Sequence, residues 1–178
     1  FGPHRGGFAW WNSSPTNGVS NYARVATYND MALSARQNIG VWAMEVLHIV
    51  TEFGDLYNVS PQIGQFDTMA CSCGTHLTAH TKSRIGWLAN NAIRTHKRGT
   101  SGGYTLHAVS HPQPPPFWRS SAVRIEAEKS SGHFMVEARL GTDPYDGSSV
   151  ISKGLPSYGV IVYEVQGDTQ VYLRTASA

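Results

Sequence analysis

An apolar stretch that also carries two ionisable side chains constrains this chain most. Hydrophobic residues recur between Ser34 and Phe53 with the spacing of a helix that is buried on nearly all sides, and Gly54 follows as a helix stop. The same stretch holds Glu45 and His48. Because burying an unpaired carboxylate costs several kcal/mol, such a helix must supply partners for these two side chains.

The spacing of the two ionisable residues is typical of a metal-binding helix. Positions 44 and 48 lie on one face of a helix about one turn apart, and position 45 is adjacent to them. In a zinc-peptidase helix, histidines at i and i+4 hold the metal and a glutamate at i+1 acts as general base. His48 and Glu45 match two of these positions, but position i is Met44. A thioether suits Cu(I) better than Zn²⁺, so we expect weak zinc binding.

Two residues further along the chain are candidates for the same site. Asp55 lies seven residues past His48, which is about 10 Å along a straight helix and too far for both to bind one metal ion. Asp55 can be a ligand only if the chain turns back, which Gly54 permits; otherwise it caps the following turn. The sequence Asp67-Thr68-Met69 predicts a tight turn with Met69 below the site.

These motifs, in this order, resemble the immune-inhibitor-A type (M6-like) zinc metallopeptidases. The likeness is carried by residues 39–48, 53–57, 67–69 and 82–88, and continues through 136–139 and 155–163. The resemblance implies a zincin-like catalytic domain that uses zinc to hydrolyse peptides or proteins. It implies that His48 and Asp55 are zinc ligands, that Glu45 is the general base and that Met69 forms the Met-turn.

The chain departs from the pattern of that family at three places. Met44 stands where the family has its first zinc-binding histidine, Thr51 replaces an expected glycine, and the spacing to Asp55 is one residue longer than usual. We therefore expect hydrolysis to be impaired, in an inactive or inactivated variant of the enzyme.

A second set of potential ligands follows the first. Cys71, Cys73, His76 and His80 form a C-x-C-x2-H-x3-H run, an alternative metal cluster whose cysteines are closer together than in usual zinc sites. In the competing interpretation, the cysteines form a loop disulfide or remain free thiols.

The pattern of the whole chain predicts a single α+β domain over residues 1–178. We expect an irregular arm at 1–18, a helical active-site half at 19–99 and a β-rich half at 100–178 with a mostly antiparallel sheet. Within these, we expect a strand at 19–28, a second helix at 77–88 capped by Thr75, and strands at 104–109, 122–127, 133–138, 159–165 and 171–174.

Composition limits the classes of partner. The 178 residues include 14 basic and 12 acidic side chains, giving a net charge of +2 that argues against nucleic-acid binding. No apolar run approaches the roughly 20 residues of a membrane span. Frequent Gly, Ser and Thr and the sequons at Asn12 and Asn58 predict an extracellular protein.

Two other functions fit the same residues. A groove beside residues 39–57 could bind a peptide or small ligand without cleaving it, and Trp118 and Tyr158 are candidate substrate-binding residues. Phe117 and Trp118 form either an exposed recognition patch, which Tyr158 could join, or pack on Trp10 or Trp11. Alternatively, Glu45 or His48 could act as an acid or base in a repurposed active site that needs no metal.

Overall fold

A computed structural model describes residues 8–12, 22–26, 35–57, 59–110, 120–127, 132–149 and 152–174. The elements, in chain order, are β1 (Phe8–Asn12), β2 (Tyr22–Ala26), α1 (Ala35–Thr51), α2 (Thr68–Cys71), α3 (Ala79–Arg84), β3 (Ile93–His96), β4 (Ala122–Glu126), β5 (His133–Arg139), β6 (Gly159–Val165) and β7 (Val171–Arg174). Short 3-10 turns at Gly64–Phe66 and Asn90–Ala92 precede α2 and β3. The predicted α+β class is confirmed.

Strands β3 to β7 form one five-stranded sheet in chain order. All neighbouring strands are antiparallel except β3 and β4, which run parallel with Ile93 opposite Ala122. The prediction of a mostly antiparallel C-terminal sheet is confirmed, but β3 has no counterpart among the predicted strands. The strand predicted at 104–109 is wrong: that segment forms only an isolated bridge, between Leu106 and Ser120, and one hydrogen bond from the N–H of Val109 to the carbonyl oxygen of Ala138 in β5.

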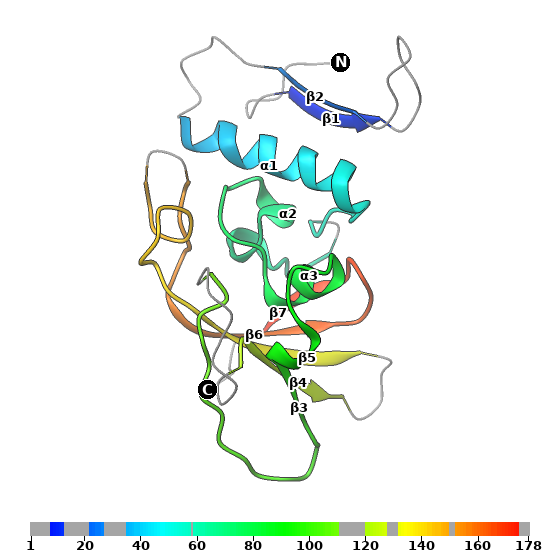
Figure 1. Cartoon of the computed structure of the whole chain (residues 1–178), viewed down its shortest axis with the longest axis vertical. Coiled ribbons are helices and arrows are strands. Elements are labelled where there is room, and N and C mark those ends of the chain that lie inside the picture. The colour runs from blue at the N-terminus through cyan, green and yellow to red at the C-terminus, as the bar shows by residue number, and fades with distance from the viewer. Residues whose placement is uncertain are drawn as a thin grey trace.

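Helix α1 lies between two layers (Figure 1). The hairpin of β1 and β2 contacts one side of α1, and α2 packs on the other, above α3 and the five-stranded sheet. Residues 8–12 were expected in an irregular arm; they pair instead with β2, Phe8 opposite Ala26. Aromatic residues favour strands, and this preference outweighs the turn-forming residues around them.

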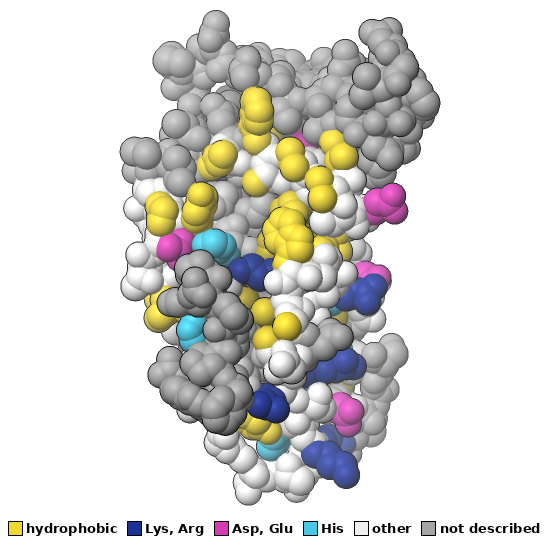
Figure 2. All heavy atoms as spheres, viewed as in Figure 1, with side chains coloured by type: hydrophobic (Ala, Val, Ile, Leu, Met, Phe, Trp, Pro, Cys, Tyr) yellow, Lys and Arg dark blue, Asp and Glu magenta, His cyan; other side chains and the backbone are white. Residues whose placement is uncertain are grey.

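One stripe of α1 is exposed, although other elements cover the helix on two sides. Met44 and Leu47 belong to the core that fills the space between helices and sheet, whereas Ile39, Trp42, Val46 and Val50 are 41–67% exposed. Figure 2 shows hydrophobic side chains gathered over this part of the molecule. The prediction of nearly all-round burial is therefore wrong for the described part of the chain. None of the described helices is long and apolar enough to cross a bilayer.

One glycine sets how closely α1 approaches the segment before α3. A Cβ atom on Gly40 would lie 2.0 Å from the carbonyl oxygen of Ser72 and 2.4 Å from the amide nitrogen of Gly74. Only glycine permits this backbone contact, which lies one turn before Met44 and Glu45. The loop at 72–74 therefore fixes the position of the helix turn that carries the candidate site.

The second predicted helix is shorter than expected. Helix α3 begins after Thr78, whose Oγ1 accepts a hydrogen bond from the backbone N–H of Thr81, so Thr78 and not Thr75 is the N-cap. The Oδ2 atom of Asp67 accepts hydrogen bonds from the hydroxyls of Thr78 and Thr81 at 2.9 and 2.6 Å. This buried carboxylate ties the start of α3 to the start of α2, where Asp67 is itself the N-cap.

Candidate active site

Helix α1 directs Glu45 and His48 into the interior. Glu45 is 5% exposed and His48 is 4% exposed, and the charge of each acts on the other. They are three positions apart in the chain, so they lie on adjacent turns of one side of the helix. The structure therefore brings together the two ionisable residues that the sequence singles out.

The chain turns back after α1 and brings Asp55 to His48. Helix α1 ends at Thr51, and Glu52 takes a left-handed conformation with φ 55°. The reversal places Asp55 Oδ1 3.0 Å from His48 Nε2. The turn that brings His48 and Asp55 together is thus present. The residue with the left-handed backbone conformation is Glu52 and not Gly54, which the sequence suggested.

The hydrogen bonds of His48 fix the roles of its two ring nitrogens. Nδ1 lies 2.7 Å from the carbonyl oxygen of Phe53, which can only accept, so Nδ1 carries the proton. In a neutral imidazole Nε2 is then an acceptor, facing a carboxylate oxygen that is also an acceptor. Two acceptors at 3.0 Å repel each other unless a positive charge lies between them, either a proton on Nε2 or a metal ion.

The electrostatics of the pair favour the protonated imidazole when no metal is bound. Burial disfavours the charged imidazole, but hydrogen bonds to Asp55 and to the Phe53 carbonyl, with the charges of Asp55 and Glu45, outweigh it and raise the pKa of His48. Burial alone would raise the pKa of Asp55, but hydrogen bonds from His48 and Tyr57 lower it. Each residue therefore stabilises the charged form of the other.

Tyr57 is a member of the site that the motif analysis missed. Its hydroxyl donates to Asp55 Oδ2 at 2.7 Å, and burial together with this bond raises the pKa of Tyr57 to about 12. Tyr57 is 42% exposed, so it lies on the solvent side of Asp55. The only sequence signal for Tyr57 was its position two residues after Asp55. The direction of its ring depends on the turn that follows α1.

Glu45 has an unusual environment for a carboxylate. Its Oε2 atom is buried and has no hydrogen-bond partner among the described residues. Burial raises the pKa of Glu45, the charge of His48 acts in the opposite direction, and the charge of Asp55 adds to the rise. A buried oxygen without a partner is costly in a folded protein and calls for an explanation, such as a catalytic role or a bound water or ion.

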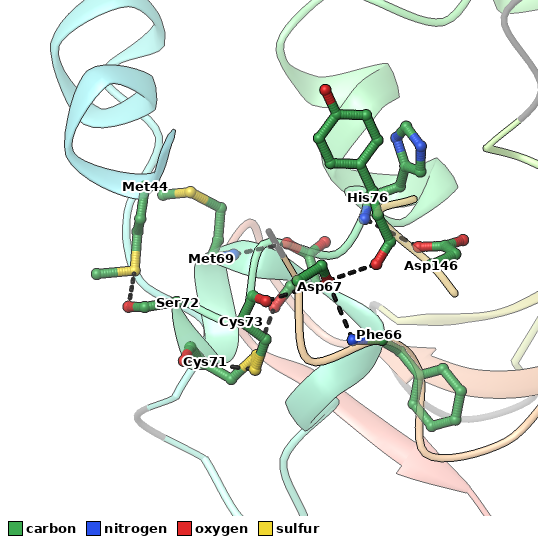
Figure 3. The surroundings of a disulfide bond; sticks show 12 residues. Met44, Phe66, Asp67, Met69, Cys71, Ser72, Cys73, His76 and Asp146 are labelled. Atoms are coloured by element: carbon green, nitrogen blue, oxygen red, sulfur yellow. Dashed lines mark hydrogen bonds between the residues drawn. A yellow bond between two sulfur atoms is a disulfide. The ribbon is translucent and has the colours of Figure 1, made fainter. Parts of the chain in front are cut away.

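Met44, on α1, and Met69, on α2, both belong to the buried core (Figure 3). The Sδ atom of Met44 accepts a hydrogen bond from Ser72 Oγ at 3.2 Å, and Met44 is part of the core. Met69 is fully buried in α2, and its carbonyl oxygen accepts the N–H of Leu56 at 3.0 Å. Met69 therefore supports the residue that directly follows Asp55.

The alternative metal cluster is not assembled. Cys71 and Cys73 form a disulfide (Figure 3), so neither offers a thiolate, as the competing interpretation allowed. His76 Nε2 lies 3.3 Å from Asp143 Oδ1, and His80 Nε2–H donates to the carbonyl oxygen of Asp168. Over the described ranges, no group of three or more His, Cys, Asp or Glu side chains is placed to hold a metal ion.

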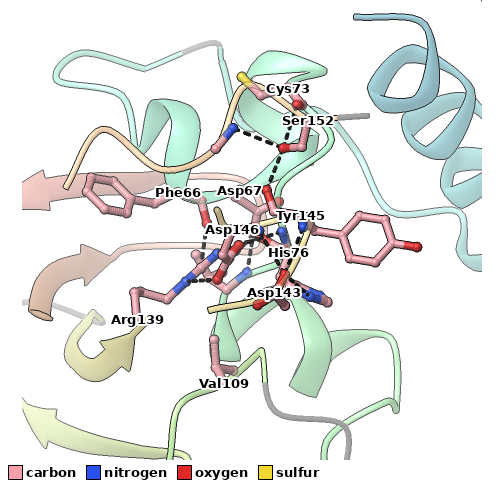
Figure 4. Close-up of polar contacts among 12 residues, drawn as sticks. Phe66, Asp67, Cys73, His76, Val109, Arg139, Asp143, Tyr145, Asp146 and Ser152 are labelled. Carbon is pink, nitrogen blue, oxygen red and sulfur yellow. Dashed lines mark hydrogen bonds and ion pairs between the residues drawn. The ribbon is translucent and has the colours of Figure 1, made fainter. Parts of the chain in front are cut away.

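A buried ion network holds the loop that pairs with His76 (Figure 4). Arg139 is fully buried, forms ion pairs with Glu137 and Asp146, and donates to the carbonyl oxygens of Phe66 and His76. Asp146 accepts the backbone N–H of His76 in turn. The sequence could have predicted this buried pair, because the alternation along β5 places Glu137 and Arg139 on the same face as the core residue Met135.

The structure describes only one of the two candidate substrate-binding aromatics. Trp118 lies outside the described residues. Tyr158 is 57% exposed and packs over Gly141, where an added Cβ would lie 2.1 Å from its ring. Among the described residues, cavities of about 440, 510 and 580 Å³ are present, and none of the three is lined by Tyr158, Glu45 or His48.

Comparison of the chain with protein-family models, with curated proteins and with solved structures found no match. We therefore infer function from the residues of this chain.

Proposed function

We propose that this protein is a zinc-dependent peptidase of impaired activity, in which His48 and Asp55 bind the metal and Glu45 is the general base. One observation carries the proposal: His48 Nε2 and Asp55 Oδ1 lie 3.0 Å apart, near a buried carboxylate oxygen of Glu45 that has no hydrogen-bond partner among the described residues. Nitrogen and oxygen ligands of one tetrahedral zinc ion lie about 3.3 Å apart, so the two atoms are close to that spacing.

The surroundings of the pair suit a metal site. Metal-binding histidines usually donate their second ring N–H to a carbonyl or carboxylate, as His48 Nδ1 does to Phe53. The hydroxyl of Tyr57 orients Asp55 from the other oxygen. Zinc bound there would polarise the scissile carbonyl of a peptide and lower the pKa of water to about 7.

Glu45 is placed to take the proton from the attacking water. A general base works best when its pKa is near the working pH, and burial shifts the pKa of Glu45 upward in that direction. Its Oε2, which has no hydrogen-bond partner within the described part of the chain, offers the acceptor atom for this proton. The same group would then return the proton to the leaving amine.

Met44 explains why the activity is low. Its thioether takes the position of an imidazole ligand, and it accepts a hydrogen bond from Ser72 within the core. With two protein ligands in place of three, zinc affinity falls. The wider zincin-like arrangement, with Met69 as the Met-turn, belongs to the same proposal, supported by the burial of Met69 in the same core as Met44.

The test restores the missing ligand. Met44→His is expected to raise zinc affinity by at least about tenfold and to raise cleavage of a denatured, fluorescently labelled protein. Zinc content is measured by elemental analysis after dialysis. Glu45→Gln in the same background should keep the zinc and lose about 100-fold in cleavage, because only the base is removed.

A matched control separates this effect from a simple gain of histidine. Trp42→His adds an imidazole on the exposed side of α1, outside the cavity along that helix, and should change neither zinc content nor cleavage. If Met44→His also leaves both unchanged, the proposal is wrong. Cleavage that survives a chelator would favour the metal-free acid–base alternative instead.

Peptides or proteins are the proposed substrates, and the extracellular space is the proposed location. The disulfide between Cys71 and Cys73 supports that location, because disulfides persist mainly in oxidising compartments.

One observation favours a second candidate function, peptide binding without cleavage. A largely apolar cavity of about 510 Å³ lies along α1, between Val46, Val50 and Trp87. It could hold an apolar side chain of a bound peptide. Saturable binding of an apolar peptide in the presence of chelator, weakened by Val50→Asp and without cleavage products, would support this function.

A further inference from the structure

The five-stranded sheet carries a cavity of about 440 Å³ that shares no lining residue with the candidate active site. Side chains from neighbouring strands form its floor, since Thr95 lies opposite Arg124 and Arg124 lies opposite Met135. The end of α3 and the turn at 166–168 form its wall. Small-molecule sites usually enclose roughly 300–1,000 Å³, so this cavity has a suitable size.

The cavity is rich in hydrogen-bond donors and in positive charge. Its polar lining comprises two arginines, two histidines, two hydroxyls, one amide and one carboxylate: Arg84, Arg124, His80, His133, Ser83, Thr95, Gln166 and Asp168. The carboxylate is already neutralised, because Asp168 Oδ2 lies 2.6 Å from Arg84 Nη2. Within the described part of the chain, no carboxylate forms an ion pair with Arg124.

The imidazole of His133 is the second group without a compensating partner. It is partly buried on β5 and makes no hydrogen bond to a described residue. Its ring centroid lies 6.4 Å from that of His80. Burial, followed by the charge of Arg124 and the proximity of His80, lowers the pKa of His133 to about 4. Glu126 lies opposite His133 in the sheet but does not line the cavity.

The other histidine is held in place. His80 Nε2–H donates to the carbonyl oxygen of Asp168 at 2.9 Å, and its ring packs edge-on against Phe53. The His80 side chain is therefore held in place by its own contacts. Arg124 and His133, which line the same cavity, still have N–H groups that can donate hydrogen bonds to a ligand.

We propose that this cavity binds a small molecule through a phosphoryl group, with Arg124 and His133 as its main ligands. A phosphate oxygen supplies the negative charge that Arg124 lacks and the acceptor that His133 lacks. The hydroxyls of Ser83 and Thr95 are further donors for a tetrahedral anion. Ile93, Met135 and Val165 line the apolar remainder, which leaves room for an organic group beside the phosphate.

The test follows the His133 imidazole by NMR while inorganic phosphate is added to the whole chain in the presence of a chelator. We expect a saturable shift with a dissociation constant of about 1 mM or below, and a rise of at least about one unit in the pKa of His133. Arg124→Gln should weaken binding by about tenfold or more. Arg94→Gln removes the same charge from the other face of β3 and should leave binding unchanged.

Two related probes define the ligand class. Tighter binding of phenyl phosphate than of phosphate would indicate a phosphorylated small molecule, and equal binding would indicate free phosphate; the proposal stands in both cases. It is overturned if His133 shows no saturable shift, if Arg124→Gln binds phosphate as well as the unmodified chain, or if acetate binds as tightly as phosphate.

Discussion

His48 and Asp55 stabilise each other's charged form, and this sets a pH dependence. The pKa of His48 is raised above 6.5, so its contribution to stability is complete below about pH 6.5 and is lost as the pH rises through the raised value. The pKa of Asp55 is lowered below 3.8, so its contribution is present above that pH and is lost as the pH falls through the lowered value. Both contributions are complete between about pH 4 and 6.5.

Asp55→Asn should therefore lower the free energy of unfolding most within that window. We expect a loss of about 1–2 kcal/mol near pH 5, shrinking above the pKa of His48, in metal-free protein unfolded by denaturant. Tyr57→Phe, which leaves the imidazole–carboxylate contact intact, should keep the pH dependence. A loss of equal size at every pH would show that His48 and Asp55 are not charge-coupled.

Single residues of the site were predictable to different degrees. Glu45 and His48 could be identified because they lie in an apolar helix, where burying an ionisable side chain without partners is costly. The approach of Asp55 depends on one left-handed residue after Thr51, and the sequence offers Gly54 for it, whereas the chain uses Glu52. Tyr57 depends on that same turn, so its contact could not be foreseen.

At the level of elements, Gly40 couples α1 to the loop at 72–74. Gly40→Ala should lower the free energy of unfolding by about 1–3 kcal/mol, because its Cβ would overlap backbone atoms that have no room to move, even though alanine favours helix. The measurement is denaturant unfolding. Gly103→Ala, at a position with open space around it, is the control and should change stability little. An unchanged value for Gly40→Ala would mean that the helix does not touch the loop.

Elements were predicted well where the hydrophobic periodicity is strong. They were predicted poorly where contacts with distant segments determine the position of the element. The apolar stretch gives α1 within a few residues, and β6 and β7 have the expected bounds, because alternation with β-branched residues is clear there. The start of α3 was misplaced because Thr75 and Thr78 are both good caps, and the buried carboxylate of Asp67 selects Thr78. Strand β3 is short and gains its pairing only from β4.

At the scale of the whole molecule, Arg139 joins β5 to the segments before α2 and α3. Arg139→Met should cost about 3–5 kcal/mol in unfolding free energy, because it leaves the buried carboxylates of Glu137 and Asp146 without their cation. Arg174→Met is the matched control: Arg174 pairs with Glu164 near the surface and should cost about 0–1 kcal/mol. Equal costs in thermal or denaturant unfolding would contradict a structural role for the buried network.

The packing of the layers against one another could not be predicted from the sequence alone. The α+β class follows from the change of pattern near residue 100, but the contact of α1 with the β1–β2 hairpin, and the cavity between α3 and the sheet, arise from residues far apart in the chain. No local pattern places Arg124 beside His133.

The most direct test is a zinc titration of the Met44→His variant, followed through the NMR signals of the His48 imidazole. Zinc at His48 and Asp55 should shift those signals with a stoichiometry of about one ion per chain and release about one proton, since the metal replaces the proton between the two residues. Asp55→Asn in the same background should weaken this binding. If zinc leaves the His48 signals unmoved, or binds equally well without Asp55, then the metal site is not where we place it.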